Sequence, residues 1–206
     1  MWKRLVEKIT ALRAHESSAA NWNGISYAMK PPAGAAAVES FELNQDVRLP
    51  DDYREFLLQV GDGGAGPGYG LYSLEQSLAE RGDGVWSLRD PFVAPLSARE
   101  WVDLRAPGML LLHHDGCAYY TGLVVAGPER GTVWSYVEVQ PGWVPVCSAA
   151  VTHADGKPYE LEGSGSEHYA RWYDVMLAPH NRGLRMTFSE HYERWLDSVV
   201  KSATTS

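Results

Sequence analysis

The sequence has little cysteine, fewer basic than acidic side chains, and no long apolar run. Cys117 and Cys147 are the only cysteines in 206 residues, which excludes a disulfide framework and favours a reducing compartment. The 18 basic and 26 acidic side chains give a formal net charge of −8. This balance disfavours nucleic acid as a direct ligand, because phosphate contacts need basic patches, and it favours encounter with a basic partner. No stretch approaches the roughly 18 apolar residues of a membrane span.

Targeting and catalytic motifs are also scarce. Residues 1–18 include Glu7 and Glu16 and lack the uninterrupted apolar run of a signal peptide. We therefore expect a cytoplasmic protein without a membrane partner. The sequence contains no G-x-S-x-G motif and no prominent pair of carboxylates. We expect no catalytic residues, no cofactor and no metal, and the oligomeric state stays open.

Apolar residues at helical spacing predict helices toward both ends of the chain. The first is expected over about residues 2–17, and the others follow at about 35–45, 50–60 and 73–80 and in two C-terminal stripes, Tyr169–Leu177 and Tyr192–Val200. Ser73 with Gln76, and Thr187 with Glu190, have the spacing of capping boxes that begin helices.

Segments rich in branched and aromatic residues predict strands in the middle of the chain. They cover residues 108–114, 118–127 and 131–139, and a fourth strand is expected at 143–149. Short links, including Asp115-Gly116, join the first three, which is typical of an antiparallel meander. The fold class is therefore α+β, a single domain with helices packed on a mainly antiparallel sheet.

Glycines crowd the segment that follows the helix predicted at 50–60. Gly61, Gly63 and Gly66 spell G-x-G-x-x-G, the spacing of a dinucleotide-binding fingerprint. That fingerprint must follow a strand and open a helix, so that the pyrophosphate meets the helix N-terminus. Here the glycines leave a helix, no P-loop lysine follows, and Gly61 stands where a left-handed C-cap belongs. We interpret the loop as a structural turn.

The sequence "HHDGC" over residues 113–117 is the most enzyme-like cluster. A histidine and a cysteine can act as base and nucleophile, so a hydrolase that uses His114 and Cys117 with Asp115 is one hypothesis. Neighbouring strand residues face opposite sides of a sheet, however, and catalytic partners usually come from distant segments. A metal site of His113, His114 and Cys117 is also disfavoured, because Cys147 and His153 supply no standard second ligand pair.

The segment "LPDDYREFLLQVGDGGAGPGYGLYSL" over residues 49–74 resembles the signature of the SUKH superfamily. This superfamily includes bacterial immunity proteins and related fungal regulators of cell-wall synthesis. The matching residues are Leu49-Pro50, Asp52-Tyr53, Phe56-Leu57, Gly61, Gly63-Gly64 and Gly66-Pro67-Gly68-Tyr69-Gly70. The order of elements agrees over about residues 36–200. The resemblance implies an α+β fold and a non-enzymatic role in which the protein binds a partner.

Two functions are compatible with this resemblance. The first is an immunity protein that neutralises a cognate toxin, for example a nuclease with a basic substrate groove, by binding it. The second is an intracellular regulatory module that binds several partners and no toxin. We expect the partner-binding surface near the glycine loop and the hairpin turn, and its candidate residues are Asp62, Tyr69, Asp115, Tyr119 and Trp134.

The same resemblance divides the chain into three segments. Residues 1–35 are expected to form an N-terminal helix and a variable segment, residues 36–201 the SUKH-like domain, and residues 202–206 a frayed tail. The role of the loop at 150–166 stays open at this stage.

Overall fold

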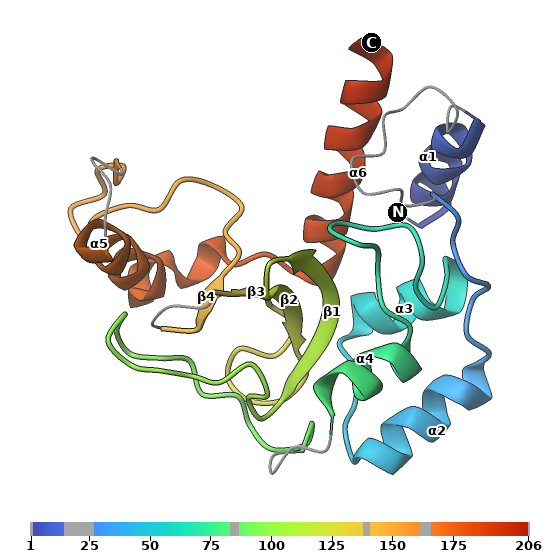
Figure 1. Cartoon of the computed structure of the whole chain (residues 1–206), viewed down its shortest axis with the longest axis horizontal. Coiled ribbons are helices and arrows are strands. Elements are labelled where there is room, and N and C mark those ends of the chain that lie inside the picture. Colours follow the sequence, from blue (N-terminus) through green and yellow to red (C-terminus); the bar gives the residue numbers. More distant parts are fainter. Residues whose placement is uncertain (1, 15–26, 83–86, 138–140, 161–165, 206) are drawn as a thin grey trace.

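Figure 1 shows the fold as a computed structural model, which describes residues 2–14, 27–82, 87–137, 141–160 and 166–205. A four-stranded antiparallel sheet has the order β1-β2-β3-β4. Its strands are β1 (Met109–Gly116), β2 (Tyr119–Val124), β3 (Val133–Tyr136) and β4 (Trp143–Pro145). The helices before it are α1 (Trp2–Ala14), α2 (Ala35–Gln45), α3 (Asp51–Gln59) and α4 (Leu74–Arg81). Those after it are α5 (Ser166–Leu177), the 3₁₀ helix η1 (Pro179–Leu184) and α6 (Phe188–Thr205).

The α+β fold and the antiparallel meander are therefore confirmed, with one domain and helices at both ends. The capping box at Ser73 and Gln76 is present at the start of α4. The predicted position of the hairpin turn was wrong. Asp115 and Gly116 lie within β1, and the turn falls two residues later, at Cys117 and Ala118. The three segment boundaries stay predictions, and residues 15–17 and 138–139 of the expected elements lie outside the described residues.

Both faces of the sheet are covered. Successive side chains of β1 point to opposite faces of the sheet, and the side chains on both faces are buried. Leu110 and Leu112 enter one buried cluster with side chains of α1, α3 and α6. Met109 and Leu111 enter a second cluster with Phe92 and the tryptophans of β3 and β4. The long segment between α4 and β1 thus covers the face opposite α6. Figure 1 shows α1 beside α6, with α5 at the other end of the sheet.

Helix α1 belongs to the main core. Trp2, Leu5, Ile9 and Leu12 are all buried in the cluster that contains α3 and α6. The Trp2 indole also donates a hydrogen bond of 2.8 Å to Glu55 of α3. These contacts agree with the amphipathic spacing that predicted the helix.

Close backbone approach explains the glycines after α3. Gly64 has a φ of +106°, and a Cβ there would lie 2.4 Å from the Ala28 carbonyl oxygen. Gly64 N donates to Leu71 O at 2.9 Å and Ala65 N donates to Ala28 O at 3.0 Å. These loop amides donate to backbone carbonyls of the protein itself, as expected for a structural turn. The predicted left-handed cap at Gly61 was wrong: the C-cap is Val60, in a right-handed conformation, and Gly61 is needed because a Cβ would lie 2.5 Å from Lys30 O.

A buried ion pair holds the second core against the segment before α6. Arg185 pairs with Glu129, and both side chains are less than a tenth exposed; Arg182 Nε lies 3.2 Å from the same carboxylate. The Arg185 guanidinium also lies over the Trp134 ring, 5.1 Å from its centroid. Because two cations face this one carboxylate, its loss leaves the buried Arg185 charge uncompensated.

We expect Gly64→Ala to destabilise the protein by about 3 kcal/mol or more, through left-handed strain and the clash with the Ala28 carbonyl. Gly131→Ala is the matched control, because Gly131 also has a positive φ, +91°, but nothing lies within 4 Å of its Cβ position. It should cost only the strain, about 1–2 kcal/mol. Chemical denaturation measures both. Equal losses for the two variants would show that close approach is not what requires Gly64.

Glu129→Gln should lower the free energy of unfolding by about 3 kcal/mol, since it leaves Arg185 buried without its counter-charge. Asp46→Asn removes the exposed Asp46–Arg89 pair, whose side chains are 78% and 62% exposed, and should change stability by less than about 0.5 kcal/mol. Thermal and urea unfolding of both variants check the contrast. A neutral effect of Glu129→Gln would contradict a structural role for the buried pair.

Candidate functional site

The glycine loop docks on the end of β1 through its backbone. Tyr69 N donates to His114 O at 2.9 Å, and Tyr72 N donates to Leu112 O at 2.8 Å. Gly68 has a φ of +57°, and a Cβ there would lie 2.2 Å from the same His114 oxygen. The loop and the β1–β2 hairpin therefore form one continuous surface. We call it the loop–hairpin surface and define it by Tyr69, His114, Asp115, Tyr119 and Tyr120.

Three of the five predicted partner-binding residues lie on this surface. Tyr69 is 52% exposed and Tyr119 is 45% exposed. The ring of Tyr69 lies beside Gly116, which pairs with Tyr119 in the register of the hairpin. Asp115 directly precedes Gly116 in β1, and its side chain is 34% exposed. Two large aromatic side chains and a carboxylate thus reach solvent near the tip of the hairpin.

The other two predicted residues lie elsewhere. Asp62 is half-buried and its Oδ1 accepts a hydrogen bond of 2.9 Å from Leu74 N at the start of α4. Trp134 is fully buried, donates from its indole to Thr132 Oγ1 at 2.8 Å, and packs edge-on against Phe92. In this structure Asp62 fixes the entry into α4 and Trp134 belongs to the core.

A β-bulge decides which of the two neighbouring histidines faces α6. The register shifts between Leu111 and His113, so His113 pairs with Thr121 and His114 pairs with Tyr120. His113 is buried and its ring stacks on His191 of α6. His114 faces the other side, where its ring lies between Tyr69 and Tyr120.

His113 belongs to a buried polar cluster under the hairpin. Its Nε2 lies 3.3 Å from Nε2 of His191, so one ring donates and the other accepts. Its Nδ1 lies 3.0 Å from Oδ1 of Asp115, and the Thr121 hydroxyl donates to Oδ2 at 2.9 Å. Burial raises the pKa of Asp115, but His113 and Thr121 outweigh burial and hold it below its usual value. The carboxylate at the tip is therefore ionised and fixed in position.

His191 titrates far from its ordinary range. Burial, followed by the neighbouring charges of His113 and Arg194, lowers its pKa to about 4, although Asp115 opposes the shift. The ring is therefore neutral at physiological pH. The sequence gives no signal for His191, because it stands singly on a helix and only the fold brings it to β1.

The hydrolase hypothesis gains no geometric support from the contacts of its histidine. The ring contacts of His114 are with Tyr69 and Tyr120, at centroid distances of 5.4 and 4.5 Å. Cys117 is exposed and sits in the turn with a φ of +48°, followed by Ala118 at +62°. Two residues of positive φ form the tight turn that the right-handed twist of a hairpin favours. Cys117 thus occupies a turn position at the tip.

Tyr120 and Glu80 were not among the predicted partner-binding residues, yet Tyr120 belongs to the loop–hairpin surface and Glu80 lies at its rim. Tyr120 continues the aromatic contact of His114 across the hairpin. Its hydroxyl donates to Glu80 of α4 at 3.5 Å. Strand pairing places Tyr120 opposite His114, and this pairing could have been inferred from the meander had the bulge been foreseen. Nothing in the local sequence indicates that Glu80 reaches the hairpin.

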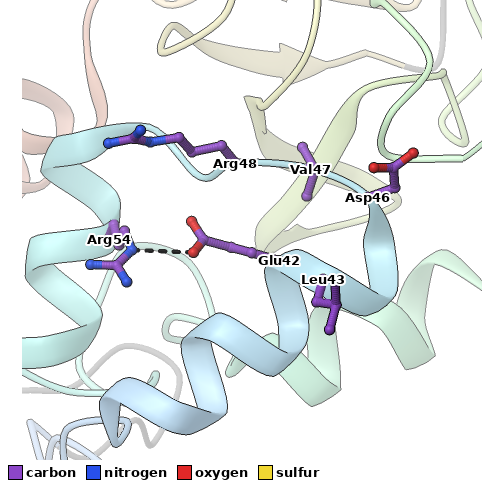
Figure 2. A pocket seen from close by; sticks show the side chains of 6 residues that line it. All are labelled: Glu42, Leu43, Asp46, Val47, Arg48 and Arg54. Carbon is purple, nitrogen blue, oxygen red and sulfur yellow. Dashed lines mark hydrogen bonds and ion pairs between the residues drawn. The ribbon is translucent and has the colours of Figure 1, made fainter.

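Two hollows lie away from this surface. One, of about 680 Å³, lies between α2 and α3, and an ion pair of 3.2 Å joins Arg54 to Glu42 there. Figure 2 shows these two side chains pointing toward each other. Glu42 also accepts from Leu49 N at 3.0 Å, so its carboxylate is already occupied. The second, of about 480 Å³, lies between α5 and the β3–β4 region and is mostly apolar, with Trp172 and Tyr173 in its wall. Burial raises the pKa of Cys147 at its edge, which disfavours the thiolate.

The described residues contain neither a metal-binding cluster nor a membrane-spanning helix. Among the described residues, no group of three His, Cys, Asp or Glu side chains is arranged to hold a metal ion. In the ranges that Figure 1 draws as ribbon, no helix combines the length and apolar character needed to cross a bilayer.

Comparison with known proteins identifies a family. The family model described as SMI1 / KNR4 family (SUKH-1) matches residues 32–161, which is more than half of the chain. The matched region includes the glycine loop and the whole sheet. No curated protein matches the chain.

The His113–His191 contact predicts a pH dependence. Because the folded pKa of His191 is about 4 and the ordinary value is about 6.5, the unfolded chain binds the extra proton between these values. Stability should therefore fall by up to about 3 kcal/mol as the pH drops from about 6.5 to 4. His191→Gln should flatten this part of the profile.

His168→Gln is the control, since His168 stands in the same "HY-x-RW" sequence on α5. Urea unfolding at a series of pH values measures the slope for each variant. A His191→Gln profile as steep as that of the parent protein would show that another group causes the acid sensitivity.

Proposed function

The chain belongs to the SMI1/KNR4 family (SUKH-1), and we propose that it is a non-enzymatic binding protein that neutralises a cognate toxin. In this proposal it is a cytoplasmic immunity protein, and its partner is a basic toxin domain, for example a nuclease. The family match supports a role in binding other proteins. The loop–hairpin surface is the observation that carries the proposal furthest.

This surface has the composition and rigidity of a binding site. Tyrosine is enriched among the residues that dominate binding energy, and both Tyr69 and Tyr119 reach solvent. Their backbones are held by the loop–strand hydrogen bond at His114 and by the hairpin ladder. A rigid presentation reduces the ordering cost of association, so exposed rings on a fixed backbone favour tight binding.

Charge supports a basic partner. The formal net charge of −8 favours fast encounter with a basic domain. Asp115 is ionised at the hairpin tip, and Glu80 is exposed on α4 beside Tyr120. A toxin that acts on nucleic acid needs a basic groove, and an acidic surface that covers this groove blocks the substrate.

Capture and co-expression test the proposed function. Tagged protein is used to isolate companions from the source cells, and each companion is then expressed alone and with this chain. We expect one stoichiometric companion that arrests growth alone and is harmless in the presence of this chain. Several weak companions without toxicity would favour the regulatory module instead. An enzymatic activity of this chain that is lost in Cys117→Ala would favour the hydrolase hypothesis.

Single substitutions then locate the interface. Tyr69→Ala and Tyr119→Ala should each weaken binding of the captured companion by about 30-fold, because buried interface tyrosines contribute about 2 kcal/mol. Leu43→Ala is the matched control, since Leu43 is 81% exposed but lies at the α2–α3 hollow. Isothermal titration calorimetry measures the three affinities. A large loss for Leu43→Ala with none for the tyrosines would move the interface to that hollow.

A further inference from the structure

An aromatic stack crosses the loop–hairpin surface from the glycine loop to β2. The Tyr69 and His114 ring centroids are 5.4 Å apart with an interplanar angle of 25°. The His114 and Tyr120 centroids are 4.5 Å apart at 30°. One ring comes from the loop, one from β1 and one from β2, so the stack forms only when the loop docks on the hairpin.

The outermost ring lies against the hairpin backbone. The Cβ position of Gly116, which has a φ of +98°, is 3.5 Å from the Tyr69 ring, an ordinary van der Waals distance. The backbone amide of Tyr69 is bonded to His114 O. His114 stacks on the Tyr69 ring, yet the residue is 52% exposed. About half of Tyr69 is therefore accessible to a ligand.

Two carboxylates flank the stack. Asp115 Oδ1 lies 2.8 Å from the Cβ position of Gly68, immediately before Tyr69. Glu80 accepts from the Tyr120 hydroxyl at the other end. Burial raises the pKa of Tyr72, whose backbone amide donates to Leu112 O of β1, and the charges of Glu80, Tyr120 and Asp115 raise it further. The negative potential of both carboxylates thus reaches this part of the loop.

We propose that the exposed part of Tyr69, beside Asp115 and with Glu80 at the far end of the stack, receives an arginine side chain of the partner protein. This inference rests on the proposed function and names the chemical group by which the partner is recognised. A cation is attracted to the face of an aromatic ring. A planar guanidinium also stacks on the ring while its N–H groups reach a carboxylate, which the compact lysine ammonium does less well.

The test uses small probes, so it does not require the partner. N-acetyl-arginine amide is titrated into the isotope-labelled protein, and the amide and aromatic resonances are followed by NMR. We expect saturable shifts, in the millimolar range of a single-group contact, centred on Tyr69, His114 and Tyr120. N-acetyl-citrulline amide, which has nearly the same shape without the charge, should produce no such shifts.

Variants separate stacking from folding and from charge. Tyr69→Phe keeps the ring and should retain binding, whereas Tyr69→Leu keeps apolar bulk and should weaken binding at least about 5-fold. Glu80→Gln should weaken it about 3-fold. Tyr169→Leu changes a tyrosine on α5 that is 43% exposed and should have no effect. Each variant is first shown to keep the spectrum of the folded parent.

The outcomes separate this inference from the proposed function. Equal shifts with citrulline, shifts elsewhere on the protein, or lysine amide binding as tightly as arginine amide would each overturn the arginine site. A captured toxin that binds Tyr69→Leu as tightly as the parent would also overturn it and leave the proposed function standing. If the chain binds arginine specifically but has no toxic companion, the arginine site is supported and the proposed toxin-neutralising function is wrong.

Discussion

The backbone of the glycine loop passes within hydrogen-bonding distance of two other segments, residues 28–30 and the end of β1. Gly64 exchanges hydrogen bonds with Leu71 and lies against Ala28, while Tyr69 and Tyr72 donate to carbonyls of β1. Side chains at Gly64 or Gly68 would occupy the space of these carbonyls. Glycine is required there because backbone must pack on backbone, and the docking of α4 and the loop on the sheet follows from that packing.

The same contact creates the exposed surface. Loop docking places Tyr69 beside His114, and the β-bulge before His113 turns His114 toward the loop and His113 toward α6. The inner histidine then contacts His191 and Asp115, so the carboxylate at the hairpin tip is fixed from below. One strand irregularity thus connects the core helix, the charged group and the aromatic rings of the surface.

Much of the fold could be predicted from the sequence, whereas the site could be predicted only in part. Helical spacing and branched residues identified α1, α2, α3 and the four strands, because these patterns report local burial. Tyr69, Asp115 and Tyr119 lie on the loop–hairpin surface, and their role in binding stays a prediction, whereas Trp134 is buried against Phe92 and Arg185. The positions of the bulge, of His191 and of Glu80 depend on packing between distant segments. The residue spacing of a single sequence does not report such packing.

Hydrogen–deuterium exchange of the chain with and without its captured partner shows whether the loop–hairpin surface is the binding site. Binding should slow exchange in residues 66–70 and 114–120 and leave residues 42–54 around the α2–α3 hollow unchanged. Protection confined to residues 42–54, with exchange at the hairpin tip unaltered, would contradict this binding site.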